Sequence, residues 1–338
     1  MKLGRLVAGA ANYLRVSDSY AFLRRIVTKS QIAILAYHRV SPSKDVYYGD
    51  MSVSPENFEN QIRYLSQNFE VLSLGDLVNL VRLGAVPDKA AAVTFDDGYR
   101  DNYVHALPIL KKYDIPATVF LATGHIGTGE VFWWDEVWYA LCHSATERVD
   151  LEGIGSCPLT SEVNELREES ITAIVETLKR IPDPRRSSLV EKVISICKVQ
   201  IPNDLGEQLM LSWREVEEMN CEGIAFGSHG VHHLLLTDIP LEQVRKEAIQ
   251  SKNTIQEKLG KEVTAFSYPY GSFNAQVVET VKNAGFAYAV TAGVDKLISP
   301  KDDVHLLHRI TPDDDFSKFK LMLCGLWGDL NASLGNRI

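Results

Sequence analysis

The chain has 338 residues, 45% of them hydrophobic, and a formal net charge of −9 at neutral pH. This length and apolar content predict one large domain, or one domain that carries an insertion, and the negative charge argues against nucleic acid as the main partner. No apolar run reaches the roughly 18 residues that span a bilayer. The five cysteines have no paired spacing, which predicts free thiols in a reducing compartment.

Residues 1–30 form a basic amphipathic segment in this otherwise acidic chain. Leu3, Leu6 and Leu14 recur at helical spacing, and several lysines and arginines are interspersed with one acid, Asp18. We expect a helix that either packs on the outside of the domain or lies on an anionic membrane surface. The segment lacks the apolar stretch and cleavage site of a secretion signal. The sequence therefore predicts a cytoplasmic protein, peripheral at the inner membrane face if the helix binds lipid.

Short apolar runs and helical stretches alternate over residues 31–125 and again over 212–312. The expected strands are Ile32 to Tyr37, Val71-Leu72, Ala91 to Phe95, Ala117 to Leu121, Phe286 to Thr291 and His305 to Ile310. The expected helices are Pro55 to Gln67, a helix from about Leu74, Tyr103 to Lys112 and Leu241 to Leu259. Because strands and helices alternate, the sequence predicts an α/β fold built as a parallel barrel.

Residues 126–211 break this alternation and predict a mainly helical insertion without strands. The insertion begins with an aromatic segment that contains Trp133 and Trp134. Since aromatic rings commonly stack on sugar faces, these two residues could form a glycan platform; alternatively, they only pack the insertion against the barrel. Residues 313–338 also have a helical apolar pattern and predict a C-terminal helix packed against the body.

Two adjacent carboxylates, Asp96 and Asp97, follow the strand expected at Ala91 to Phe95, and Gly98 predicts the turn that ends it. Neighbouring carboxylates at the end of a strand are costly unless a cation holds them. A divalent metal can bind one carboxylate while the other moves protons. The alternative interpretation is a capped Asp-Gly turn.

Three of the nine histidines lie within the segment Gly227-Ser228-His229-Gly230-Val231-His232-His233, after another strand candidate at 223–226. His229 and His233 are four residues apart, so one helical turn or a tight loop puts both imidazoles on the same side. Two imidazoles and one carboxylate form a three-ligand site with open positions, as in catalytic metal centres. Both clusters follow strands, and active sites of α/β folds are built at that edge.

A third segment, Phe266-Ser267-Tyr268-Pro269-Tyr270-Gly271, follows a strand candidate at 261–265. Its proline and glycine predict an irregular loop whose backbone amides can converge on a developing oxyanion. A plain strand-to-helix turn is the alternative.

In this order, the three segments resemble the polysaccharide deacetylases of the NodB-homology type, carbohydrate esterase family four. Two further segments, Ala36-Tyr37-His38-Arg39-Val40-Ser41 and Val53-Ser54-Pro55-Glu56-Asn57-Phe58, are similar to the bacterial branch of that family. The resemblance covers roughly residues 31–125 and 212–312. It implies a distorted, incomplete (β/α) barrel, in agreement with the alternation of strands and helices.

The resemblance also implies roles for individual residues. Asp97, His229 and His233 would bind a divalent metal, zinc first, with cobalt, nickel or manganese as alternatives. Asp96 would be the general base, and the Tyr270 backbone amide would share the oxyanion with the metal. The residues expected around the substrate are Tyr268, Pro269, Gly271, Trp133, Trp134, His38, Arg39 and Arg309.

Two positions depart from the pattern of the family. Many relatives have an arginine that tethers the base two residues before the proline of the third segment, where this chain has Ser267. Arg39 or Arg309 could serve instead. The general acid that protonates the leaving amine would be His308, with His38 at the end of the first strand as the rival candidate.

The resulting hypothesis is a metal-dependent hydrolase that removes N-acetyl groups from an amino sugar. The substrate would be an acetylated glycan or a lipid-linked glycan precursor. The alternatives are an O-acetyl esterase acting on a glycan and a non-catalytic carbohydrate-binding barrel. The complete set of Asp96, Asp97, His229 and His233 argues against the last of these.

Overall fold

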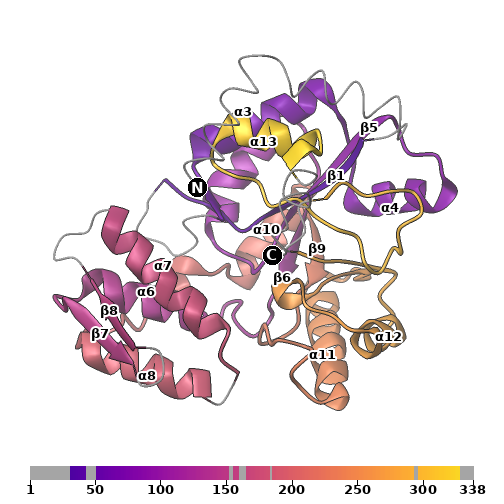
Figure 1. Ribbon diagram of the computed structural model, residues 1–338. Helices are drawn as coiled ribbons and strands as arrows, with labels where there is room; N and C mark the ends of the chain where they lie inside the picture. Colours follow the sequence, from indigo (N-terminus) through magenta and orange to yellow (C-terminus); the bar gives the residue numbers. More distant parts are fainter. Residues whose placement is uncertain are drawn as a thin grey trace.

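The computed structural model describes residues 31–42, 51–151, 155–159, 165–182, 185–292 and 296–327. A curled parallel sheet wrapped by helices forms the main body, and a smaller lobe lies beside it (Figure 1). The amphipathic segment 1–30 and residues 328–338 of the expected C-terminal helix lie outside the described residues. Within the described ranges, no helix is both long and apolar enough to cross a membrane.

The central sheet has seven strands, and its paired strands are all parallel. In spatial order it contains β1 (Gln31–Tyr37), β5 (Lys89–Phe95), β6 (Ala117–Leu121), β9 (Ala225–Ser228), β10 (Ala265–Ser267) and β11 (Tyr288–Val290), while β4 (Glu70–Val71) pairs with the first half of β5. A separate small sheet pairs β2 (Arg39–Val40) with β3 (Ser52–Val53). The curled sheet confirms the predicted distorted, incomplete barrel.

The strand expected at His305 to Ile310 is instead an irregular segment that links the two edges of the sheet. Leu307 bridges to Val290 of β11, and Ile310 bridges to Leu35 of β1, both in parallel orientation. These isolated contacts bring the end of the barrel chain back to its first strand, which places residue 309 close to the end of β5.

The strands of the sheet are buried on both faces, which explains their continuous apolar runs. In β5, Ala90, Ala92 and Thr94 share one face with Asp96 because side chains alternate along a strand. Ala91 and Val93 point to the other face and pack in the large core beneath the helices. The two-residue period therefore decides which side chains of β5 reach the site.

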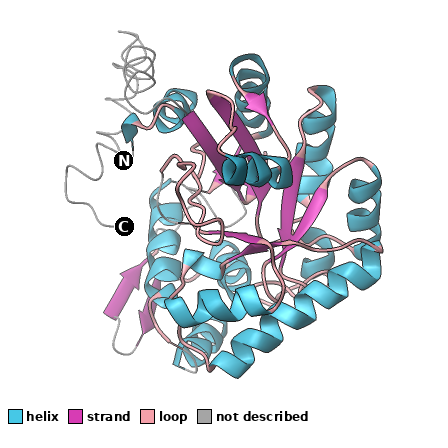
Figure 2. Ribbon diagram, turned by 90° about the vertical axis from the view of Figure 1, so that its right-hand side faces the viewer, coloured by secondary structure: helices cyan, strands magenta, loops and turns pink. Residues whose placement is uncertain are grey.

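Helices surround the sheet (Figure 2). Around the barrel these are α3 (Pro55–Asn68), α4 (Leu74–Leu83), α5 (Leu107–Lys112), α10 (Trp213–Cys221), α11 (Leu241–Leu259), α12 (Ala275–Asn283) and α13 (Phe316–Leu323). Ser54 caps α3 by accepting a hydrogen bond from the Asn57 amide. The helix expected from Tyr103 is divided, because a π-helical turn at Asn102–Ala106 precedes α5. In Figure 1, α13 lies against α3.

The segment 126–211 forms the smaller lobe (Figure 1). It contains α6 (Trp133–His143), α7 (Glu165–Lys179), α8 (Arg185–Cys197) and α9 (Leu205–Leu209). It also contains an antiparallel hairpin of β7 (Arg148–Leu151) and β8 (Gly155–Pro158), so the expectation of no strands was wrong. Only two residues of β7, Val149 and Leu151, alternate inward, which is too short a pattern to indicate a strand.

Candidate metal centre and active site

Three buried side chains converge where β5 and β9 end. Asp97 follows β5, His229 and His233 follow β9, and their candidate ligand atoms all lie within 4.8 Å of one another. Asp97 Oδ1 is 3.5 Å from His229 Nε2 and 3.3 Å from His233 Nε2. Ligand atoms bound tetrahedrally to one zinc at about 2.0–2.1 Å lie about 3.3 Å apart. The donor set therefore fits a divalent metal.

Both imidazoles are in the form that binds metal. The carbonyl of Ser267 can only accept, so His229 Nδ1 donates the hydrogen bond of 2.8 Å between them, which leaves the Nε2 lone pair facing Asp97. Burial lowers the pKa of His229, although Asp96 opposes the shift. Burial, and then the neighbouring His229, hold the pKa of His233 well below its usual value. Neutral imidazoles at neutral pH need not lose a proton before they bind a cation.

Backbone strain is concentrated at this site. Five non-glycine residues of the described part have positive φ, and three of them are Asp97 (φ 74°), His233 (φ 54°) and Tyr270 (φ 57°). Such conformations cost about 1–3 kcal/mol each and persist only where the surroundings enforce them. Each of the three loops is therefore bent in a way that a plain turn would not require.

Asp96 is held by an arginine from the far end of the barrel chain. Arg309 Nη1 donates to Asp96 Oδ1 at 2.7 Å, and Arg309 Nη2 donates to Asp96 Oδ2 at 2.5 Å. Burial by itself raises the pKa of Asp96, but the charge of Arg309 and its hydrogen bonds outweigh burial and hold this pKa well below its usual value. Asp96 is thus ionised at neutral pH and fixed in orientation.

Arg309 is a positioning residue rather than one that touches the substrate, which corrects the sequence expectation. Its side chain is fully buried, and it also donates to Thr291 O at 2.9 Å, Thr94 Oγ1 at 3.0 Å and Ser267 Oγ at 2.9 Å. Ser267, which stands where many relatives have the tethering arginine, itself reaches Asp96 Oδ2 at 3.3 Å. Arg309 and Ser267 together occupy the place of the missing arginine.

The two candidates for the general acid lie in different surroundings. His38 is buried after β1, and its pKa is lowered to about 4 by burial, with Asp96, Arg309 and His229 as its electrostatic neighbours. His308 is half-buried and its Nδ1 lies 3.3 Å from Thr291 Oγ1. The charged neighbours of His308 are Lys296 and Asp302, and Asp96 is not among them. The structure brings His38, and not His308, to Asp96.

Of the substrate residues expected in the loop after β10, the structure brings some to the metal candidates and places Tyr268 elsewhere. Pro269–Gly271 forms a single 3₁₀ turn, and the Tyr270 ring contacts the His233 ring edge-to-face at 4.6 Å between centroids. Gly271 is required, because a Cβ there would lie 2.4 Å from Ala292 O. Tyr268 faces the other side of the strand from Ser267 and packs against Phe266, so the structure does not bring it to the site.

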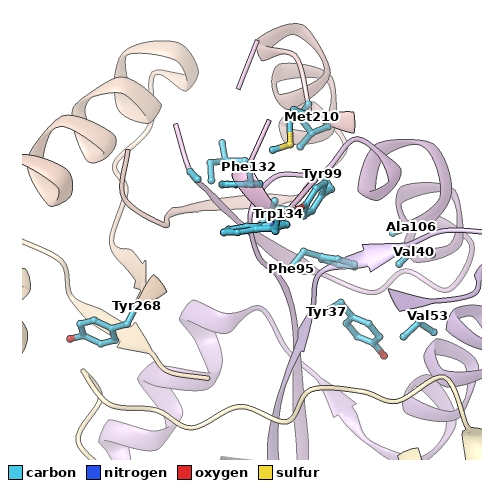
Figure 3. Packing of buried hydrophobic residues seen from close by; sticks show 14 of the residues in the cluster. Tyr37, Val40, Val53, Phe95, Tyr99, Ala106, Phe132, Trp134, Met210 and Tyr268 are labelled. Atoms are coloured by element: carbon cyan, nitrogen blue, oxygen red, sulfur yellow. Dashed lines mark hydrogen bonds between the residues drawn. The ribbon is translucent and has the colours of Figure 1, made fainter. Parts of the chain in front are cut away.

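Trp134 is packed inside the protein and Trp133 is partly buried, which favours packing of the insertion over a sugar platform, the two alternatives that the sequence left open. Trp134 is 1% exposed, stacks on Phe132 at 4.5 Å and contacts the His233 ring at 5.1 Å. The Trp133 ring is covered by the Arg186 guanidinium of α8. Figure 3 shows Phe132 and Trp134 one above the other and Tyr268 apart from them. These rings support the metal candidates from behind.

Arg39 was expected near the substrate but belongs to a buried network behind the site. It pairs with Asp101, and its guanidinium lies 4.1 Å from the centroid of the Tyr99 ring. Trp134 Nε1 donates to Tyr99 Oη at 2.9 Å, and Tyr99 donates to Asp135 Oδ2 at 2.9 Å. Burial raises the pKa of Asp135 to about 7, against the opposing charge of Arg39.

Sequence reasoning missed several residues that surround the site. Thr94, Phe132 and His125 all contact site residues or their immediate support, and His125 packs against the Phe132 ring at 4.1 Å between centroids. Strand alternation would have found Thr94, two residues before Asp96. The sequence holds no comparable signal for Phe132 and His125, because they come from the loop that leads into the insertion.

A sequence model of the polysaccharide deacetylase family matches residues 84–289, which is more than half of the chain. Bacillus subtilis YxkH, named as a polysaccharide deacetylase, is 21% identical over 283 residues, covering 83% of this chain and 71% of that protein. The poly-β-1,6-N-acetyl-D-glucosamine N-deacetylase of Staphylococcus aureus is 38% identical over 107 residues. This second match covers 28% of this chain and 36% of that protein.

A solved structure has the same fold at low sequence identity. The deacetylase PplD of Streptococcus pyogenes, in complex with acetate, has a TM-score of 0.59 with this chain at 20% identity. The match covers 87% of this chain and 97% of PplD. The likeness covers most of the chain and shows the fold.

Proposed function

The chain belongs to the polysaccharide deacetylase family, and on this premise we propose that it hydrolyses N-acetyl groups of amino sugar units in a glycan with a divalent metal. One observation carries the proposal: the buried Asp97, His229 and His233 lie at metal-ligand separations from one another. Asp96, ionised and fixed by Arg309, lies beside them. Such a site combines the two needs of amide hydrolysis, a polarised carbonyl and a proton acceptor.

A divalent cation in this site would polarise the acetamide carbonyl and lower the pKa of a coordinated water. Asp97, His229 and His233 would hold the cation, with zinc the first candidate and cobalt, nickel or manganese the alternatives. Asp96 would accept the proton of the attacking water. Its ionised state at neutral pH supports this role, and the two hydrogen bonds from Arg309 keep its carboxylate from rotating.

We assign the proton delivered to the leaving amine to His38 rather than His308. His38 is electrostatically coupled to both Asp96 and His229, whereas His308 contacts Thr291. With a pKa of about 4, the His38 imidazole is neutral in the resting enzyme. Asp96 would take a proton from the attacking water, and His38 would receive that proton and pass it to the leaving amine.

Tyr270 would contribute its backbone amide to the developing oxyanion. Its left-handed conformation, with φ 57° and ψ 10°, is stabilised by the ring contact with His233. Because a fixed amide needs no reorganisation when charge develops, such strain is useful in an oxyanion site. Pro269 and Gly271 would support this turn without contacting the substrate by side chains.

The N-acetyl amino sugar is favoured over an O-acetyl ester by the relatives of the chain. The Staphylococcus aureus relative is named as an N-deacetylase of poly-β-1,6-N-acetyl-D-glucosamine, and the chain spans 36% of its length. An esterase would need the same metal, base and proton transfer, but its leaving group would be a sugar alcohol instead of an amine. An O-acetyl esterase is therefore the second candidate, and it differs from the first in its product.

The test uses short β-1,6-linked N-acetylglucosamine oligosaccharides and measures free amine and acetate separately. Equal release of amine and acetate, lost in Asp97→Asn, would establish N-deacetylation. Acetate without amine, from an O-acetylated glycan, would establish the esterase. The absence of both products from zinc-loaded protein with either substrate would leave a carbohydrate-binding barrel as the function.

We also propose that the substrate is a lipid-linked glycan precursor and that the protein meets it at the inner face of the membrane. This proposal is supported by the basic residues among 1–30, since each basic residue near an anionic surface contributes about 1 kcal/mol. Flotation with anionic liposomes at low and high salt, for the full chain and for a version without residues 1–29, tests it. If neither floats at low salt, the membrane proposal fails.

A further inference from the structure

One buried acid close to the metal candidates takes no part in the chemistry proposed above. Glu247 lies on α11 and is 4% exposed, on the helix face that also carries Val244, Ala248 and Ser251. This face packs against β9, the strand that leads into the histidine loop. A buried carboxylate is costly unless hydrogen bonds compensate for the lost water, so its partners indicate its role.

All partners of the Glu247 carboxylate belong to the loop between His229 and His233. Glu247 Oε2 accepts hydrogen bonds from the amides of Val231 at 2.7 Å and His232 at 2.9 Å. Glu247 Oε1 lies 2.7 Å from His232 Nδ1. Successive amides that converge on one anion form a compact, directional contact. The carboxylate therefore fixes the part of the loop that separates the two imidazole ligands.

The loop needs such a contact because its backbone turns sharply and is strained at His233. Gly230 (φ 78°) and His233 (φ 54°) are both in the left-handed region, which glycine adopts freely but histidine only at a cost. A Cβ at Gly230 would lie 3.1 Å from Glu247 Oε2, so the carboxylate also restricts what can stand there. Without a partner for its amides, this loop would relax towards a lower-energy turn.

A second residue of the same helix face contacts the start of the loop. Ser251 lies one helical turn after Glu247, and its Oγ is 2.6 Å from Ser228 Oγ. Ser228 Oγ in turn accepts a hydrogen bond from the Gly230 amide at 3.2 Å. Helix α11 thus holds the loop at residues 228–230 through Ser251, and at residues 231–232 through Glu247.

We propose that Glu247 is a positioning residue for the metal centre: it presets the loop so that His229 and His233 present both imidazoles to one cation. This inference rests on the proposed function, because it concerns the same metal. A preset loop spends no binding energy on ordering itself, so the carboxylate raises metal affinity without touching the metal. Partners of this kind typically contribute 10–100-fold in affinity.

The test measures zinc affinity directly, by competition with a chromogenic chelator on metal-free protein. Glu247→Gln keeps the size of the side chain but removes the negative charge on which the amides of Val231 and His232 converge. We expect the dissociation constant for zinc to rise about 10–100-fold. The absorption spectrum of the cobalt-loaded variant should also change, while its circular dichroism stays that of the wild type. A purely structural role would leave both metal readouts unchanged in the folded protein.

Glu257→Gln is the matched control, because Glu257 is an exposed acid on the same helix, and its zinc affinity should equal that of the wild type. The inference is wrong if Glu247→Gln has the zinc affinity and cobalt spectrum of the wild type. If Asp97→Asn loses the metal in the same experiment, the proposed metal centre still stands. A wild-type protein that binds neither zinc nor cobalt would refute the proposed function itself. If Glu247→Gln does not fold, Glu247→Asp replaces it, because this variant shortens the side chain but keeps the charge. Its zinc affinity must then be lower than that of the wild type.

Discussion

Arg309 and Asp96 form a two-bonded ion pair across 213 positions of the sequence, with the guanidinium and the carboxylate both buried. Arg309 comes from the irregular segment that returns to β1, and Asp96 from the end of β5. Planar, doubly bonded pairs of this kind fix orientation as well as charge. Asp96, the proposed proton acceptor, is therefore oriented by the C-terminal segment of the barrel.

Replacing Arg309 should shift the pH dependence of the reaction. Arg309→Lys keeps the positive charge but loses the second hydrogen bond. Since Arg309 holds the pKa of Asp96 below its usual value, weakening the pair raises that pKa. The base must be ionised, so the acid limb of kcat/KM should move to higher pH, and kcat should fall by at least about tenfold. An unmoved acid limb would contradict the proposed coupling.

Arg309→Met leaves a buried charge unpaired and should destabilise the fold by about 3–5 kcal/mol.

Replacing Asp96 should separate catalysis from metal binding. Asp96→Asn keeps the shape of the side chain and removes the proton acceptor, so turnover should fall about 10²–10⁴-fold. Metal content, measured by elemental analysis, should stay at the wild-type level. Asp97→Asn is the comparison and should lose the metal. If the Asp96 variant loses its metal instead, then Asp96 is a ligand and the division of roles within the pair is wrong.

Zinc affinity should vary little with pH over the range where free histidine titrates. Protons compete with metal only below the pKa of an imidazole ligand, and burial lowers the pKa of both His229 and His233 from 6.5. The fall in affinity on acidification should therefore come at a lower pH than the titration of free histidine, as chelator competition would measure. A steep decline centred near pH 6.5 would mean that the imidazoles titrate as in water.

Chelation should abolish activity, and added zinc should restore it.

The two histidine candidates for the proton donor should respond differently to substitution. His38→Ala should lower kcat for N-deacetylation at least about tenfold, because His38 lies in the electrostatic neighbourhood of Asp96 and His229. His308→Ala serves as the control and should stay close to wild-type activity, since its side chain faces Thr291. The reverse pattern, an inactive His308 variant beside an active His38 variant, would return the role to His308.

Asp135 should make the protein less stable as the pH rises from about 4 to 7. Its pKa is raised from 3.8 to about 7 in the folded state, so the folded protein binds a proton there that the unfolded chain releases. The stability contributed by protonated Asp135 is therefore present at low pH and lost by about pH 7. Asp135→Asn removes this titration. Between about pH 4 and 7 the variant should therefore avoid a decrease in unfolding free energy that is on the order of 4 kcal/mol at most. Urea denaturation of both proteins at several pH values measures it. Parallel pH dependences would contradict the assignment.

The sequence by itself determined the alternation of strands and helices, the family and the three metal candidates. Strands buried on both faces produce continuous apolar runs, and motifs that follow such runs must meet at one edge of a parallel sheet. The four-residue spacing of His229 and His233 likewise put both imidazoles on one side. These features depend on local pattern and on the geometry common to all parallel sheets, so they are visible without coordinates.

Only the tertiary structure decided which residues serve those motifs. Arg309 reaches Asp96, whereas His308 contacts Thr291, because the irregular segment that carries both is placed by its bridges to β1 and β11. Trp134 is buried against Phe132, and Glu247 holds the histidine loop from a helix that begins eight positions after His233. Such partners are chosen by packing between distant segments, which no local pattern records.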